Sequence, residues 1–69
     1  MMKLGTFKEI ELGTLRAWGY DIKEIWLCKR TDINTYVLMG LCWDGEKAHG
    51  WCTLKSGTLK EVRAYARAI

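Results

Sequence analysis

The stretch over residues 22–54 places the strongest limits on the fold. It contains three runs rich in aliphatic and aromatic residues, separated by the polar segment 31–35 and by the pair Asp44-Gly45. An Asp-Gly pair between two such runs is typical of a two-residue hairpin turn. The stretch therefore predicts a three-stranded antiparallel meander.

Two similar segments flank this stretch. Residues 5–10 read Gly-Thr-Phe-Lys-Glu-Ile and residues 57–62 read Gly-Thr-Leu-Lys-Glu-Val. In each, the Thr hydroxyl can cap a helix while the Glu three positions later reaches back to the Thr amide. They predict one helix over 7–18, ending at Gly19, and another over 59–69. As a strand, the first segment would place Phe7 and Ile10 on opposite faces, which favours the helix.

The expected fold class is α+β. A chain of 69 residues has room for one small domain, residues 1–69, with a single core. The element order is αβββα, and both helices pack on one face of the meander.

The hairpin turn fixes which residues share a face. With Asp44-Gly45 as the turn, Trp43 pairs with Glu46, and Trp26 of the first strand meets Gly40. The face assigned to the helices then carries Ile25, Leu27, Val37, Met39, Leu41, Ala48, Gly50 and Cys52. The other face carries Trp26, Cys28, Arg30, Tyr36, Leu38, Gly40, Cys42, Lys47, His49, Trp51 and Thr53. A shift of one residue in either turn exchanges the two faces.

The uncovered face predicts a binding surface. Trp, Tyr and Arg are enriched at interaction hot spots, and a contiguous apolar patch with a charged rim is typical of an interface. We expect a small protein-interaction module, an inhibitor or adaptor, that docks on a larger protein; a homodimer through the same face is a second form of this hypothesis. The expected contact residues are Trp26, Arg30, Tyr36, Leu38, His49 and Trp51. Alternatively, these side chains pack among themselves or lie under the first helix.

The excess positive charge favours a second hypothesis, nucleic-acid binding. Residues 1–54 carry seven basic and seven acidic side chains, whereas residues 55–69 carry four basic ones against Glu61. Bases would stack on the sheet aromatics while phosphates meet the basic side chains. The expected contacts are Lys55, Lys60, Arg63 and Arg67. The alternative interpretation, without a binding role, is that these residues form the solvated flank of an amphipathic helix.

The cysteines and the single histidine give no catalytic or metal motif. Cys28, Cys42 and Cys52 fall one on each predicted strand, and no Cys-x-x-Cys spacing occurs. We therefore expect reduced, half-buried thiols, no metal and no cofactor. Cys52 and His49 lie three positions apart on one strand and face opposite sides, so they cannot form a catalytic pair. The chain is not expected to be an enzyme.

The expected location is the cytoplasm. The longest apolar run, residues 36–43, is far shorter than the ~20 residues of a membrane span. Charged residues follow the first four positions, where a signal peptide would be apolar.

Two families show a local resemblance. The order helix, three strands, helix resembles the double-stranded RNA-binding domain, but that family's Gly-Pro-x-His and Lys-Lys-x-Ala-Lys motifs are absent at residues 31–35 and 58–62. Residues 51–68, with Ala-Tyr-Ala-Arg-Ala after a Trp-bearing strand, are similar to the end of the plant ethylene-response DNA-binding domain. That family's DNA-reading basic strand residues have no counterpart here. Both resemblances imply topology, and neither transfers an activity.

Overall fold

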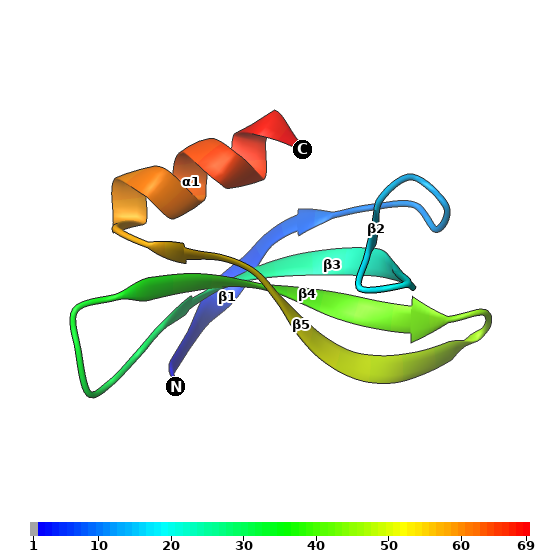
Figure 1. Ribbon diagram of the computed structural model, residues 1–69, viewed down its shortest axis with the longest axis horizontal. Coiled ribbons are helices and arrows are strands. Elements are labelled where there is room, and N and C mark those ends of the chain that lie inside the picture. Colours follow the sequence, from blue (N-terminus) through cyan, green and yellow to red (C-terminus); the bar gives the residue numbers. More distant parts are fainter. Residues whose placement is uncertain (1) are drawn as a thin grey trace.

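The computed structural model describes residues 2–69 and contains five strands followed by one helix (Figure 1). The elements, in chain order, are β1 (Met2–Glu9), β2 (Arg16–Ala17), β3 (Tyr20–Lys29), β4 (Tyr36–Asp44), β5 (Lys47–Gly57) and α1 (Leu59–Ala68). The α+β class is confirmed. The αβββα order is wrong, because the described chain has one helix, at its C-terminal end. The predicted meander is present as β3, β4 and β5, but β1 and β2 extend it to a five-stranded sheet.

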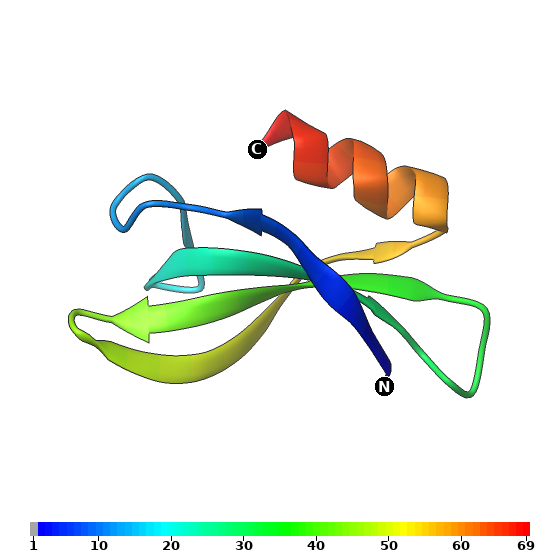
Figure 2. The same cartoon turned by 180° about the vertical axis from the view of Figure 1, so that it is seen from behind.

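The sheet is antiparallel, with strand order β1-β3-β4-β5, and the short β2 pairs with the start of β3. Helix α1 and the chain segment around β2 both rise from the same side of the sheet, as the front and back views show (Figures 1 and 2). No helix or loop of residues 2–69 lies across the opposite side. The sheet therefore has one covered and one uncovered face.

The predicted first helix does not form: residues 7–9 end strand β1, residues 12–14 form a turn and residues 16–17 are β2. Strand β1 pairs with β3, and its register shifts once between Lys3 and Gly5 and again between Thr6 and Lys8. A bulge inserts an extra residue into one strand and re-phases the residues beyond it. Phe7, at the second shift, and Ile10 consequently both pack against the core, although a regular strand would separate them.

Helix α1 agrees with the sequence prediction to within one residue. The Thr58 hydroxyl accepts a hydrogen bond from the Glu61 amide at 3.2 Å, and the Glu61 carboxylate accepts one from the Thr58 amide at 3.4 Å, so the capping box is formed. Val62 and Ala66 are completely buried against the sheet. Helix α1, the helix of the described chain, is too short to cross a membrane.

The β4–β5 turn lies one residue further along than expected. Asp44 pairs with Lys47, so the turn residues are Gly45 and Glu46, and Gly45 takes a positive φ of 65°. The facing of β4 is set by its pairing with β3: Trp26 pairs with Met39 and not with Gly40, and this one-residue change of register turns every β4 side chain to the other face. The β4 residues Leu38, Gly40 and Cys42 belong to the covered face, and Val37, Met39 and Leu41 to the uncovered one.

The assignments on β3 and on most of β5 stand. Ile25, Leu27, Gly50 and Cys52 lie on the covered side, as expected. Strand β5 keeps its facing beyond His49 because a bulge at His49 compensates for the reversal of β4. Ala48 precedes this bulge, pairs with Trp43 and lies on the uncovered side.

The core lies between the covered face and α1. It consists of the buried residues Ile22, Ile25, Leu27, Leu38, Cys42, Val62 and Ala66. A Cβ atom on Gly40 would come within 3.0 Å of the Ile22 side chain and 3.2 Å of the Leu54 side chain. A side chain at this point of β4 would therefore press on Ile22 and Leu54, which would have to move by a few tenths of an ångström.

Candidate protein-interaction face

The uncovered side of the sheet carries an aromatic and aliphatic cluster, which we call the tryptophan face. Its members share one side of β3, β4 and β5 by their register, opposite the side that packs on α1. They are Trp26, Met39, Leu41, Trp43, Trp51 and Thr53. Trp51 is 40% exposed, and Trp26, Met39, Leu41 and Trp43 are half-buried. Solvent thus reaches a continuous apolar surface across the three strands.

Trp26 and Trp51 form the centre of this face. Their rings are 5.8 Å apart, centroid to centroid, and meet edge to face at 85°. Such pairs are favourable by about 0.5–1.5 kcal/mol beyond the area that they bury. The Trp26 indole N–H also donates to the Glu24 carboxylate at 2.9 Å, which fixes the ring. Trp26 is therefore held by two contacts, and Trp51 packs against its ring.

Two lysines lie over the tryptophan rings. The Lys3 ammonium, from the outer strand β1, is 4.7 Å from the centroid of Trp51 and 5.5 Å from that of Trp26. The Lys23 ammonium, at the β3 bulge, is 4.3 Å from the centroid of Trp43. These are cation–π distances. Each ammonium is held above the apolar cluster by a ring beneath it.

Trp43 has a second unusual feature. Its indole N–H is buried and has no hydrogen-bond partner among the described residues. A buried donor without an acceptor costs about 1–3 kcal/mol. The half-buried ring thus supplies apolar area to the tryptophan face at a cost in stability.

The six predicted contact residues do not form one site. Trp26 and Trp51 lie together, as expected. Leu38 is wrong as a contact residue, because it is completely buried in the core. Tyr36 is half-buried and packs against that core on the covered side, with Lys29 5.7 Å from its ring.

Arg30 and His49 also make their contacts outside the tryptophan face. Arg30 forms an exposed ion pair with Asp32 at 3.0 Å in the β3–β4 loop. Its hydrogen bond to the Asp32 carboxylate lowers the pKa of that group below its ordinary value. His49 stacks on Tyr20 with the ring centroids 4.4 Å apart, and its Nε2 is 3.0 Å from the tyrosine hydroxyl.

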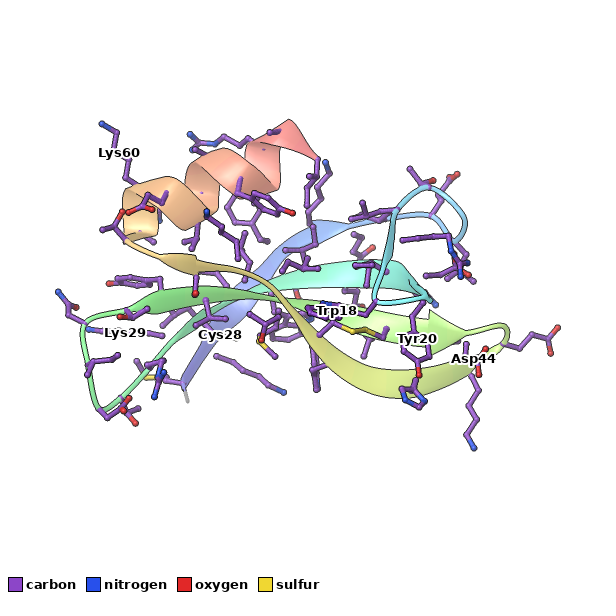
Figure 3. The ribbon with its side chains drawn as sticks, in the orientation of Figure 1. Trp18, Tyr20, Cys28, Lys29, Asp44 and Lys60 are labelled. Carbon is purple, nitrogen blue, oxygen red and sulfur yellow. A yellow bond between two sulfur atoms is a disulfide. The ribbon has the colours of Figure 1, made fainter. Side chains whose placement is uncertain are left out.

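The basic residues of the second hypothesis lie on the other side of the molecule. Helix α1 packs its buried residues on the covered face, so exposed Lys60, Arg63 and Arg67 point outward. Figure 3 shows Lys60 projecting away from the sheet. Lys55 pairs with Leu38 and is half-buried on the same side as α1. The exposed basic side chains of α1 and the tryptophan face consequently lie on opposite sides of the molecule.

Trp18 and Tyr20 connect the β2–β3 turn to β5. The Trp18 indole, 74% exposed, donates to the Thr53 carbonyl oxygen at 3.2 Å, and Tyr20 reaches His49 on the same strand (Figure 3). Trp18 has a positive φ of 58° and Gly19 one of 83°, which is the conformation of a tight hairpin turn. These two contacts link the start of β3 to β5, the strand at the far edge of the sheet.

The cysteines differ from the expectation of three free thiols. Cys42 and Cys52 are joined by a disulfide between β4 and β5, with their Cα atoms 6.3 Å apart. The register explains the pairing, because Gly40 faces Cys52 and Cys42 faces Gly50, so the two cysteines are diagonal neighbours on one face. Cys28 is a free, buried thiol, and burial raises its pKa.

Some residues of the tryptophan face escaped the sequence analysis. Met39, Leu41 and Trp43 were missed for one reason, the register of β4 against β3, in which Trp26 pairs with Met39 and not with Gly40. With that register, alternation along β4 places all three on the same face as Trp26. Lys3 and Lys23 depend on a strand and a bulge that no sequence pattern indicated.

Within residues 2–69, no three His, Cys, Asp or Glu side chains gather closely enough to hold a metal ion. A scan against protein-family models and searches of curated proteins and of solved structures found no match. The two resemblances noted in the sequence therefore gain no support.

Proposed function

We propose that this chain is a small, non-enzymatic interaction module, of the inhibitor or adaptor type, that binds a larger protein through the tryptophan face. The observation that carries the proposal is the Trp26–Trp51 pair, two rings locked edge to face on the uncovered side of the sheet. Hot spots are enriched in tryptophan, and rigid aromatic side chains lose little conformational entropy on binding.

The floor of the face supports the same function. Met39 and Leu41 fill the space between the two outer strands of the cluster, so a partner would meet a continuous apolar surface. Thr53 and the lysines provide polar groups around it. An apolar centre with a polar rim is the usual anatomy of a protein–protein interface.

Nucleic-acid binding is the second candidate, and the exposed Lys60, Arg63 and Arg67 of α1 favour it. Its original form, with phosphates on α1 and bases on the sheet tryptophans, requires one ligand to contact both sides of the molecule. A surface of three or four basic side chains supports weak, salt-sensitive binding. We therefore rank it below the protein partner.

The test is affinity capture from lysate of the native host, with and without nuclease. The wild-type protein is compared with Trp51→Ala and with a matched double variant on the other side, Arg63→Ala with Arg67→Ala. The proposal expects a nuclease-resistant protein band that Trp51→Ala removes and the double variant retains. A band that is lost only with nuclease or only in the double variant would support the nucleic-acid candidate instead.

A cytoplasmic location belongs to the same proposal. Disulfides are rare in reducing compartments, so the Cys42–Cys52 bond is the feature against which this location is tested. Alkylating the protein in intact host cells before lysis, followed by intact-mass analysis, reports whether these two thiols are free. Two free thiols fit the cytoplasm, and a protected pair points to an oxidising compartment.

A further inference from the structure

We propose that the partner surface which fits the tryptophan face is acidic as well as apolar, with carboxylates that meet Lys3 and Lys23. This inference rests on the proposed function, because it concerns the same face, and it specifies the chemistry of the partner. It follows from three features of the face: the position of its cations, the state of its carboxylates and the cover on its rings.

The two ammonium groups are fixed above the apolar cluster before any partner arrives. Lys3 lies over both Trp51 and Trp26, and Lys23 lies over Trp43, at 4.3 to 5.5 Å from the ring centroids. A lysine side chain normally loses considerable rotamer freedom when it forms an ion pair. Here the rings already restrict the side chains, so a partner carboxylate meets preorganised cations.

The acidic groups near the face are already engaged. The Glu24 carboxylate accepts from the Trp26 indole at 2.9 Å, and Asp21 pairs with Arg16 at 3.0 Å. Among residues 2–69, neither Lys3 nor Lys23 lies within ion-pair distance of a carboxylate. The face thus carries two ammonium groups and the Glu24 carboxylate, a net positive charge, and a partner with Asp or Glu opposite Lys3 and Lys23 complements it.

The ring faces argue for a protein over a nucleic acid. A base would have to stack on a tryptophan face, and the faces of Trp51 and Trp43 each carry a lysine ammonium. Stacking would displace these cations, whereas a carboxylate would add to them. Apolar side chains of an acidic protein can meanwhile cover Met39 and Leu41, the floor between the rings.

The experiment uses three short flexible peptides, with repeating Glu-Leu-Gly, Gln-Leu-Gly or Lys-Leu-Gly triplets. Binding to the full chain is followed by the intrinsic tryptophan fluorescence and by the indole N–H signals in NMR spectra. The Glu peptide should bind at least about tenfold more tightly than the Gln peptide, and the Lys peptide should not bind detectably. Its affinity should fall as salt is added. Equal affinities for the Glu and Gln peptides would overturn the proposal.

Charge reversal locates the contact. Lys3→Glu and Lys23→Glu should each weaken binding of the Glu peptide by about tenfold, while the matched reversal on α1, Lys60→Glu, should leave it unchanged. Circular dichroism confirms that each variant is folded. If Lys3→Glu is unfolded, Lys3→Gln and Lys23→Glu give the answer. A loss that appears only with Lys60→Glu would overturn the proposal, because the acidic peptide would then bind the basic helix.

The same variants separate this inference from the proposed function. In the capture experiment, one outcome is a partner that is lost with Trp51→Ala but retained with both Lys3→Glu and Lys23→Glu. That result would support the tryptophan face as the binding surface and would overturn the proposal that the partner is acidic. A captured protein retained by all three variants overturns both.

Discussion

Cys28 shows how one buried side chain gives this protein a pH dependence. The thiol is 2% exposed on β3, and burial raises its pKa above the ordinary value of 9.0 although the nearby Lys3 acts in the opposite direction. Below that value the thiol is protonated in both the folded and the unfolded chain. Above it, the unfolded thiol ionises while the folded one keeps its proton, so the unfolded state gains stability.

We therefore expect the free energy of unfolding to fall as pH rises above about 9, at up to ~1.4 kcal/mol per pH unit until the folded thiol also ionises. Urea unfolding at a series of pH values, followed by tryptophan fluorescence, measures this slope. The variant Cys28→Ala has no thiol at this site and should show a smaller decline over the same range. Parallel curves for the two proteins would mean that other groups cause the alkaline loss.

At the scale of the secondary-structure elements, α1 could be predicted from the sequence and β1 could not. The helix was predicted because its signals are local: a capping box and an apolar stripe, which the structure confirms at Thr58, Glu61, Val62 and Ala66. Strand β1 has an equally good capping pattern, but tertiary pairing with β3 overrides it. Its bulges cannot be seen in the sequence, because they depend on which partner strand is present.

The sheet residues were predicted only in part, for a related reason. The facing of β3, and with it Trp26, was correct, whereas β4 was reversed because its register with β3 differs by one residue. The polar segment 31–35 between these strands has no Asn-Gly or Asp-Gly pair that would fix the register. Packing sets it, since Leu38 fills the core and Gly40 leaves room for Ile22.

The β4–β5 pair should depend on its disulfide. The bond between Cys42 and Cys52 closes a loop with a sequence separation of 10, which in the chain-entropy description stabilises the folded state by roughly 2–3 kcal/mol. We expect reductant to lower the midpoint of urea unfolding in the wild-type protein. Non-reducing mass spectrometry before and after reduction confirms the state of the two thiols.

The matched control for this effect is the double variant Cys42→Ala with Cys52→Ala. Its midpoint should be low from the start and should not respond to reductant. A wild-type midpoint that reductant leaves unchanged, in protein whose thiols are shown to be reduced, would contradict a stabilising role for the bond.

At the scale of the whole molecule, stability is small and the larger part of the buried apolar surface lies on one side of the sheet, although Cys28 and Val37 are buried on the other. The accessible surface is 4586 Å² for a mass of 8.0 kDa, so folding buries about 60% of the surface of the extended chain. A domain of this size has a free energy of unfolding of roughly 3–10 kcal/mol. Because the buried residues of the core lie between the covered face and α1, the two sides of the sheet should tolerate the same change very differently.

A carboxylate introduced on each side of the sheet should reveal this difference. Val62→Asp buries an unpaired charge at a position with no exposed surface, which costs several kcal/mol and approaches or exceeds the total stability. Trp51→Asp loses the contact with Trp26, but its carboxylate reaches solvent and lies near Lys3. Far-UV circular dichroism and thermal unfolding should show Val62→Asp unfolded and Trp51→Asp folded with a lower midpoint. If Trp51→Asp also unfolds, the tryptophan cluster is a second core that the protein needs for stability, and a surface needed for folding is not free to bind a partner.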